Sequence, residues 1–388
     1  MMTADAVVVG GGIAGAAVAV HLGRAGREVV VLEREPDTHD KVCGEFVSVE
    51  AVHYLRALGI EPAVLGAVAI DTVKVHRARA AVDCALPFPA VSVSRRALDE
   101  AVLGAAQAAG ASVVRGRPVR ALRRGSDGWV AELDGGGGIA ARQAFLATGK
   151  HDLRGFPRPR GLQNDLLAFK QHWRPRTAAA DVRRPWVELL LFPGGYAGIE
   201  PVEDGILNLC LVVRRGRFAD VGGRWEALLA ALRAGLPRLE EALADREACF
   251  ARPLAVAAIP YGLVQRADGG PWRLGDQAAV IPSFAGDGIA IALHSARMAA
   301  DYCLAGRDGS EFQRDLARDV GPQVRRATLV SKVLVDPRGQ ALALGLARLV
   351  PALVGGIGRG TRIPARRLIH GDAREGAARL SAAVRPGT

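Results

Sequence analysis

The sequence has few cysteines, and their spacing forms no recognisable site. The 388 residues include five, which are odd in number, widely spaced and without a C-x-x-C pair: Cys43, Cys84, Cys210, Cys249 and Cys303. A disulfide framework and a structural zinc site are therefore not expected, and we predict no metal site.

The sequence shows no pattern typical of a targeting leader and no clean membrane-spanning run. The first apolar strand begins within the first few residues, with no basic-then-apolar segment before it. A cleaved signal peptide is not indicated, so we expect a cytoplasmic location. The last apolar stretch, residues 339–362, is interrupted by Arg348, Pro351 and glycines. It falls short of the roughly 20 apolar residues of a span, so we expect a packed helix, with weak membrane-surface contact as the alternative.

Positive charge is abundant but is not concentrated in one segment. The formal net charge is +11, and the arginines are scattered among acids from Arg24 to Arg385. This distribution argues against nucleic-acid binding and suits anionic cofactors. The length and the 49% hydrophobic content are those of a globular protein with one large or two interlocked domains.

What the chain does have, at its start, is a glycine pattern between an apolar strand and a helix. Gly10, Gly12 and Gly15 follow the run Ala6 to Val9, and Ile13 and Ala14 open the helical stretch between them. In such a pattern the glycines allow a tight turn, a close approach of the backbone to a pyrophosphate, and close helix–strand packing. The helix N-terminus favours an anion. The stretch predicts a dinucleotide site.

The second strand of this unit ends at an acid. Glu33 lies about 20 residues beyond the glycines, where the fingerprint places a carboxylate that accepts hydrogen bonds from ribose hydroxyls. The same carboxylate would repel a 2′-phosphate. These residues alone do not distinguish NAD from FAD.

A second cofactor-like segment lies near the other end of the chain. "WRLGDQAAVIPSFAGDGIAIALHSARMAADYCLAG" combines a strand entering Gly275 and Asp276, a loop with Gly286 and Gly288, and a long helix of small residues. We therefore expect both ends of the chain to build the dinucleotide-binding half.

Together, the glycine pattern ending in "LER", the helix "RRALDEAV", "FLATG" and "GDQAAVIPSFAGDG" resemble FAD-dependent oxidoreductases of the para-hydroxybenzoate hydroxylase and geranylgeranyl reductase superfamily. The resemblance covers roughly residues 5–305. It implies an α/β fold: a doubly wound, Rossmann-like FAD-binding domain (residues 1–70, 95–150 and 265–330), an inserted β-sheet-plus-helix substrate domain (71–94 and 151–264) and a helical C-terminal extension (331–388).

The resemblance also implies which residues hold FAD. Asp276 would bind the ribityl chain, Gly286 and Gly288 would let backbone N–H groups approach the isoalloxazine, and Arg95 would contact the flavin side. A solvated surface arginine is the alternative for Arg95. The matching segments add the remaining predicted cofactor residues: Arg34, Gly44, Gly275, Asp287 and Ile289.

The loop "KVCGEF" is the most distinctive part of the chain. Reductases of the family have a similar Cys-Gly pair beside the flavin, so Cys43 and Gly44 are predicted to reach the reacting face. Lys41 would favour a thiolate if it lies close to Cys43. Glu45 is then a candidate acid or base. The alternative is that Cys43 is a buried, inert cysteine.

Two further segments bear on the chemistry. Where the hydroxylases carry "DGxxSxxR", this chain has "ATGKHDLRG", so the usual use of NADPH is in doubt, and NADPH or NADH would bind transiently. Where relatives carry "YxWxFP" or "WxWxIP" over the substrate, this chain has "YAGIEP". Tyr196, Gly198 and Glu200 are the predicted substrate residues. The absence of the tryptophans disfavours halogenation, although Lys74 lies broadly where halogenases have their catalytic lysine.

We therefore expect an FAD-dependent oxidoreductase acting on a hydrophobic small molecule. The favoured reaction at this stage is monooxygenation of a phenolic or polyketide-like substrate. A carbon–carbon double-bond reductase of the geranylgeranyl reductase type is the alternative. A non-enzymatic binding protein on the same fold is the alternative of another class.

Overall fold

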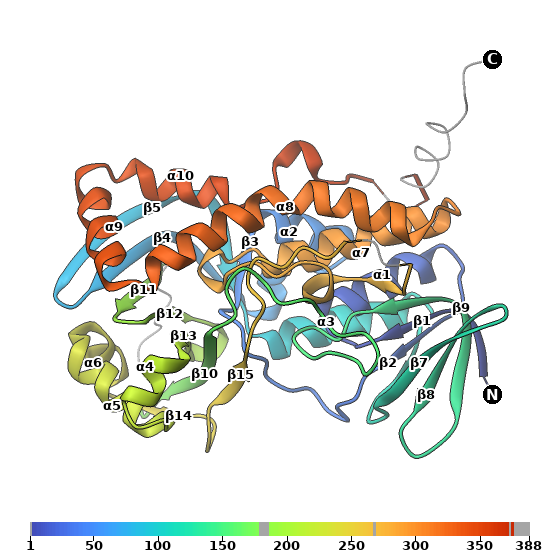
Figure 1. Cartoon of the computed structure of the whole chain (residues 1–388), viewed down its shortest axis with the longest axis horizontal. Coiled ribbons are helices and arrows are strands. Elements are labelled where there is room, and N and C mark those ends of the chain that lie inside the picture. The colour runs from blue at the N-terminus through green and yellow to red at the C-terminus, as the bar shows by residue number, and fades with distance from the viewer. Residues whose placement is uncertain (1, 178–185, 267–268, 372–373, 376–388) are drawn as a thin grey trace.

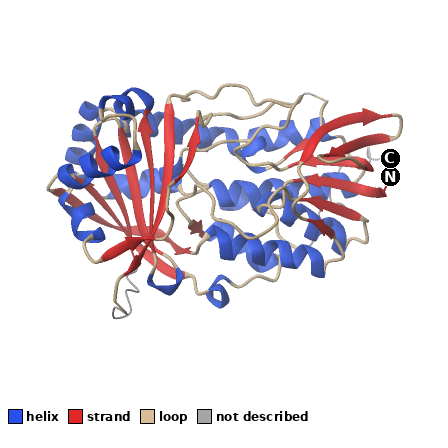
Figure 2. Ribbon diagram, turned by 90° about the horizontal axis from the view of Figure 1, so that it is seen from below, coloured by secondary structure: helices blue, strands red, loops and turns tan. Residues whose placement is uncertain are grey.

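The computed structural model describes residues 2–177, 186–266, 269–371 and 374–375. These residues form a seven-stranded and a nine-stranded sheet, which stand at opposite ends of the molecule with helices between them (Figure 2). One long helix and the C-terminal helices run along one side of both halves (Figure 1).

The first sheet has the order β6-β2-β1-β9-β8-β7, with β16 added beside β9. Its strands are β1 (Met2–Val9), β2 (Val29–Leu32), β6 (Ser112–Val114), β7 (Val119–Gly125), β8 (Gly128–Leu133), β9 (Gly138–Leu146) and β16 (Trp272–Arg273). β1 pairs in parallel with both β2 and β9. The ends of β1 and β2 are continuous valine-rich runs that are buried, as parallel strands covered on both faces require.

Three helices complete this doubly wound unit: α1 (Ile13–Arg24), α3 (Arg95–Ala108) and α7 (Gly288–Leu304). Small residues let α1 pack closely between its neighbours, since Ala14 to Leu22 are all buried. The strand at Trp272 and helix α7 join the sheet and helices built by the first 146 residues. Segments from early and late in the chain thus share one sheet and one core, and the α/β fold class is confirmed.

The second sheet has the order β14-β10-β13-β12-β11-β4-β5-β3, with β15 beside β10. Its strands are β3 (Phe46–Ser48), β4 (Val68–Arg77), β5 (Ala80–Ser92), β10 (Leu166–Pro175), β11 (Trp186–Phe192), β12 (Gly195–Pro201), β13 (Leu207–Arg214), β14 (Arg246–Ala248) and β15 (Leu254–Ala257). Alternate residues of β10, β12 and β13 pack against helices α5 (Trp225–Gly235) and α6 (Pro237–Leu243). The other residues of these strands face the first half of the molecule.

The remaining helices are α2 (Val49–Ala57), α4 (Arg215–Asp220), α8 (Gly309–Leu334), α9 (Pro337–Leu349) and α10 (Ala352–Gly360). α9 and α10 pack on β4 and β5 of the second sheet. No single helix in the described ranges is long and apolar enough to cross a membrane, although Pro337–Leu349 and Ala352–Arg367, bent by 116°, pass that test as a pair by length and composition.

Two expected boundaries differ from the structure. β3 lies within residues 1–70 but pairs with β5 in the second sheet, because the chain after the glycine motif crosses to that sheet before returning as α2. The expected start of the C-terminal extension at residue 331 falls inside α8, which continues to Leu334.

Candidate active site

The glycine turn has the geometry of a phosphate-binding loop. Gly10 has φ +107°, and a Cβ there would overlap the carbonyl of Ala147. A Cβ at Gly15 would overlap the carbonyl of Gly10. Gly12 is the N-cap of α1, and Ile13 opens the helix. The turn therefore presents a helix N-terminus at the carboxyl end of β1, where N–H groups without intrahelical partners favour an anion.

Glu33 and its surroundings form the adjoining part of this site. The Glu33 Oε2 accepts a hydrogen bond from the Gly11 N–H at 2.8 Å, and Oε1 accepts one from the Glu35 N–H at 3.1 Å. Glu33 lines a groove together with Thr38, Lys41 and other residues of the loop after β2 and of α3. Arg34 is half-exposed and pairs with Glu35 at 2.9 Å. Glu33 therefore both fixes the glycine turn and faces a groove beside it.

The late "GD" segment lies against the same helix. Gly275 has φ +54°, and its Cβ position is 3.2 Å from the Cβ of Ala14. The Gly275 N–H donates to Ser295 Oγ at 3.0 Å. Asp276 follows in the same turn, and its Oδ2 is 3.4 Å from Lys150 Nζ. The two predicted cofactor segments, distant in sequence, are thus neighbours in the fold.

The loop before α7 packs closely at Gly286 and leaves free space at Gly288. A Cβ at Gly286 would lie 2.6 Å from the Phe46 ring, whereas one at Gly288, the first residue of α7, would meet no described atom within 4 Å. Ile289 follows and is buried. The close glycine turn, the acid beside it and the open glycine at a second helix N-terminus fit an elongated dinucleotide such as FAD.

Asp287, between these glycines, is turned toward the C-terminal part of the chain. Its Oδ1 accepts hydrogen bonds from the Arg362 guanidinium at 3.2 Å and from Ser48 Oγ at 3.4 Å. Burial raises the pKa of Asp287 to about 7, although Arg362 acts in the opposite direction. A contact between Asp287 and the cofactor stays a prediction.

The loop carrying Cys43 closes over the glycine turn. A Cβ at Gly12 would lie 3.4 Å from Lys41 Nζ and 4.0 Å from an Arg95 guanidinium nitrogen. Lys41 pairs with Asp99 at 2.6 Å, and Arg95 binds the same carboxylate at 2.8 and 3.0 Å. Burial opposes the charge of Arg95, but Asp99 and the Cys43 thiol raise its pKa above the ordinary value. Both cations pair with Asp99, and of the two it is Arg95 that also interacts with the Cys43 thiol.

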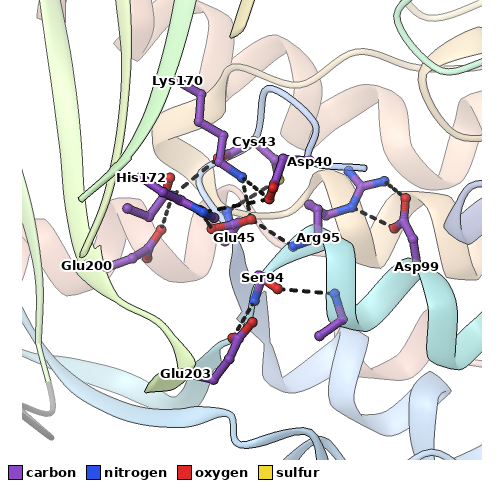
Figure 3. Close-up of polar contacts among 12 residues, drawn as sticks. Asp40, Cys43, Glu45, Ser94, Arg95, Asp99, Lys170, His172, Glu200 and Glu203 are labelled. Atoms are coloured by element: carbon purple, nitrogen blue, oxygen red, sulfur yellow. Dashed lines mark hydrogen bonds and ion pairs between the residues drawn. The ribbon is translucent and has the colours of Figure 1, made fainter. Parts of the chain in front are cut away.

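Glu45 lies at the centre of a buried group of charged residues (Figure 3). It is fully buried and has φ +62°, a left-handed conformation that is uncommon for a residue with a side chain. Its Oε1 accepts hydrogen bonds from the Arg95 backbone N–H at 2.7 Å and from Lys170, and its Oε2 lies 2.7 Å from His172 Nε2. Burial alone would raise the pKa of Glu45, but Lys170 and His172 lower it below the ordinary value. Glu45 is therefore a carboxylate at neutral pH.

Lys170 and His172 come from β10 and point to the same side because side chains alternate along a strand. Their neighbours Phe169 and Trp173 pack on the opposite side against α5 and α6. Burial lowers the pKa of Lys170, but Glu45 and Asp40 more than reverse this effect, so its pKa is raised and the ammonium stays charged. Asp40 Oδ1 is 3.6 Å from Lys170 Nζ and 3.7 Å from His172 Nδ1.

Asp40, Glu45 and His172 also have ligand atoms within 4.8 Å of one another, a spacing that a metal ion could use. The Lys170 ammonium, however, bonds Glu45 and pairs with Asp40. It supplies within the group the positive charge that a bound cation would otherwise supply, which disfavours a metal here.

Glu200 lies beside this group, but its pKa is shifted in the opposite direction to that of Glu45. It is 3% exposed, and one of its oxygens, Oε2, has no hydrogen-bond partner among the described residues. Burial and the Glu45 carboxylate raise the pKa of Glu200 well above its usual range, against smaller opposing effects of Asn208 and Lys170. Its surroundings therefore favour the protonated acid form of Glu200, beside an ionised partner.

The predicted substrate residues share one side of β12. Tyr196, Gly198 and Glu200 alternate with Ala197 and Ile199, which pack toward α5 and α6. The Tyr196 hydroxyl is 3.2 Å from Ser283 Oγ, in the loop before α7. Among the described atoms, only the Cys210 carbonyl oxygen, at 3.8 Å, lies within 4 Å of the position that a Cβ at Gly198 would take. The residues therefore face the cofactor half, with open space at Gly198.

Asn208 connects the acid to the cysteine loop. Its Nδ2 donates to Glu200 Oε1 and to the Cys43 carbonyl, both at 3.3 Å. A Cβ at Gly44 would meet only Glu200 Oε1, at 3.8 Å, among the described atoms. The structure thus brings together Cys43, Gly44, Glu45 and Glu200. Lys74 is half-exposed and pairs with Asp83 at 3.4 Å on β5.

The sequence analysis missed Asp40, Lys170, His172 and Asn208. One signal was available: Lys170 and His172 stand two apart in "LLAFKQHW", and Asn208 interrupts the apolar run "LNLCLVV". Polar residues at alternate positions of an otherwise apolar strand indicate a buried polar site.

Comparisons with known proteins agree with this geometry. Residues 3–140 match the model of the FAD binding domain family. The chain is 30% identical over 329 residues to the menaquinone reductase of Mycolicibacterium smegmatis, covering 78% of this chain and 77% of that protein. It is 41% identical over 63 residues to squalene epoxidase erg1 of Schizosaccharomyces pombe, covering 16% and 14%.

The fold is also similar to that of solved structures. The flavin-dependent brominase Bmp2 superposes with a TM-score of 0.77 at 16% sequence identity, covering 98% of this chain and 99% of that one. At this identity the likeness concerns the fold. The match to the FAD binding domain, the paired glycine segments and the relative aligned over 78% of the chain show the family: the chain belongs to the FAD-dependent oxidoreductases of the para-hydroxybenzoate hydroxylase and geranylgeranyl reductase superfamily.

Proposed function

We propose that the protein reduces a carbon–carbon double bond of an isoprenoid lipid, with Glu200 as the proton donor. The observation that carries this proposal is the buried carboxyl of Glu200, which lies against Gly44, is joined through Asn208 to the Cys43 loop, and has its acid form favoured by its neighbours. Saturation of a double bond adds a hydride to one carbon and a proton to the other. FAD, when bound and reduced, supplies the hydride, and the protein must supply the proton.

Glu200 suits this role because its acid form is maintained by its neighbours. Glu45, held as a carboxylate by Lys170 and His172, opposes ionisation of Glu200. In the reaction the O–H bond of Glu200 breaks, its proton joins the substrate carbon, and water restores it afterwards. A group that must be an acid near neutral pH needs such a raised pKa. Glu45 is therefore a positioning residue rather than the acid.

The substrate class is suggested by the surroundings and by the relatives. Gly198 leaves space on the side of β12 that faces the cofactor half, between Tyr196 and Glu200. A relative aligned with 78% of this chain is named a menaquinone reductase. Menaquinone carries an isoprenoid side chain and is the first substrate to test.

The electrons would come from NADPH or NADH bound transiently. The loop "ATGKHDLRG" offers Arg154, which is exposed, and Lys150, which pairs with Asp276 at 3.4 Å. Positive charge beside the predicted flavin-binding acid supports capture of an anionic reductant.

A second candidate is monooxygenation, the reaction favoured from the sequence. The local likeness to squalene epoxidase supports it. Such a reaction would insert one oxygen atom of O2 into a hydrophobic substrate, such as a phenolic or polyketide-like one, and reduce the other to water with electrons from the same reductant.

Oxygen dependence distinguishes the two reactions. Purified holoenzyme is supplied with menaquinone in detergent and with NADPH, NADH or a chemical reductant, in air and under nitrogen, and products are analysed by mass spectrometry. The proposal predicts a product that forms without oxygen and stays heavier by two hydrogen atoms after its ring has been reoxidised to the quinone in air. This reoxidation step is needed because reduction of the ring to the quinol also adds two hydrogen atoms. A product heavier by one oxygen atom, formed only in air, would contradict the proposal and favour the monooxygenase.

A further inference from the structure

The C-terminal helices present an apolar surface that no described part of the chain covers. Of the large hydrophobic residues that are exposed, five lie together in α9 and the start of α10: Leu342, Leu346, Leu349, Val350 and Leu353. Leu349 is 80% exposed and Leu342 64%. We call these five residues the α9–α10 patch.

Helix α9 is apolar on two sides. Leu344 and Ala347 pack against Val82 and Cys84 of β5. Leu342, Leu346 and Leu349 follow at intervals of four and three residues and form a separate stripe, which is exposed. A helix that only covered a sheet would carry polar residues on its outer side, so the outer stripe requires another explanation.

The segment that carries the patch is predominantly basic, and two of its arginines are paired with acids of other elements, Arg362 with Asp287 and Arg367 with Asp319. Residues 322–367 contain nine lysines and arginines and one acid, Asp336. Asp336 is occupied as the N-cap of α9, where it accepts the Gly339 N–H at 2.8 Å. Arg338 lies one helical turn before Leu342 on the same stripe, and Arg348 is next to Leu349; both are exposed. An apolar stripe with arginines beside it is complementary to an anionic lipid surface.

We propose that the α9–α10 patch docks the protein on the surface of an anionic lipid bilayer, with the leucines in the acyl boundary and the arginines on lipid phosphates. The helices would lie in the plane of the membrane: no single described helix is long and apolar enough to span it, and the pair that passes together is bent by 116°. This inference does not depend on the proposed reaction.

The test is co-sedimentation of the FAD-loaded protein with vesicles of phosphatidylcholine, with and without phosphatidylglycerol. We expect binding to the anionic vesicles that weakens as salt rises. Leu346→Ser/Leu349→Ser should lower the partition coefficient about tenfold or more, because two leucines no longer enter the acyl boundary. Val64→Ser, which alters an 84% exposed valine outside the patch, should bind like the wild type.

Flavin content and thermal midpoint of each variant show that it is folded. Equal binding of the double variant and the wild type would overturn the proposal, as would equal binding to neutral and anionic vesicles. Absence of vesicle binding together with a dimer by light scattering, lost in the double variant, would show that a second copy covers the patch and would also overturn it.

Discussion

Removal of Lys170 should destabilise the protein strongly and in a pH-dependent way. Lys170 and Glu45 are both fully buried and bonded to each other, and Glu45 keeps only His172 and the Arg95 N–H when the lysine is replaced by methionine. Loss of one partner of a buried ion pair costs about 3–5 kcal/mol. Because His172 remains 2.7 Å from the carboxylate, we expect the lower end, about 3 kcal/mol, for Lys170→Met.

The sign of the pH dependence follows from the pKa of Glu45. In the wild type this pKa is lowered on folding, so the stabilisation is present above the unfolded value of about 4.3 and is lost as the pH falls through the folded pKa. Without Lys170, burial would raise the pKa of Glu45 instead. In the variant, protonation of Glu45 should then remove the buried charge as the pH falls. The loss of unfolding free energy relative to the wild type should therefore be larger near pH 8 than near pH 5.

The assay is urea unfolding of the FAD-loaded proteins, followed by circular dichroism at the two pH values. Lys74→Met is the matched control, because Lys74 is half-exposed and its pair with Asp83 at 3.4 Å should contribute at most about 1 kcal/mol. Lys170→Met/Glu45→Gln should recover part of the loss, since no carboxylate is then left uncompensated at position 45. A deficit in Lys170→Met no larger than that in Lys74→Met would refute the reasoning.

Three further predictions concern the cofactor site. Glu33→Ala and Asp276→Ala should each weaken FAD binding about tenfold or more while the protein stays folded, since a hydrogen bond to a charged group contributes about 1.5–3 kcal/mol; normal FAD affinity in both, by fluorescence titration, would contradict the assigned site. Cys43→Ala should keep its flavin and lose turnover if the thiol acts chemically, whereas full activity would leave the loop a structural wall. The pKa of Asp287 is raised to about 7 in the folded protein. Its contribution to the free energy of unfolding is therefore fully present at low pH and is lost as the pH rises through 7. Asp287→Asn should flatten that fall in urea titrations near pH 5 and 8, and an unchanged pH slope would show that this carboxyl is not its source.

Much of the fold could be predicted because its signals are local. The turn at Gly10 to Gly15 needs glycine for reasons visible within a few residues, and the structure places those glycines against Ala147 and α1 as the motif requires. The proximity of this turn to Gly275 and Asp276 could also be predicted, because both motifs match parts of a site for the same cofactor, FAD.

The charged group around Glu45 could not be found in the same way. Lys170 and His172 lie 125 and 127 residues away from Glu45 in the chain. Their contact depends on which side of β10 faces the loop, and on the register that places His172 beside Asn208. Glu200 was predicted at the substrate, but its raised pKa depends on its burial and on the Glu45 charge beside it, which a motif does not report.

The central claim is that Glu200 protonates a substrate reduced by the flavin. The most direct test is anaerobic single turnover: holoenzyme reduced with one equivalent of dithionite is mixed with menaquinone, and flavin reoxidation is followed by absorbance. We predict reoxidation in step with a product that stays heavier by two hydrogen atoms after its ring has been returned to the quinone in air, and we predict that both are slowed about a hundredfold or more in Glu200→Gln. Both should be unchanged in Glu203→Gln, an acid nearby that accepts the Ser94 N–H at 2.9 Å. Flavin that stays reduced until oxygen is admitted, or a Glu200→Gln variant as fast as the wild type, would contradict the account.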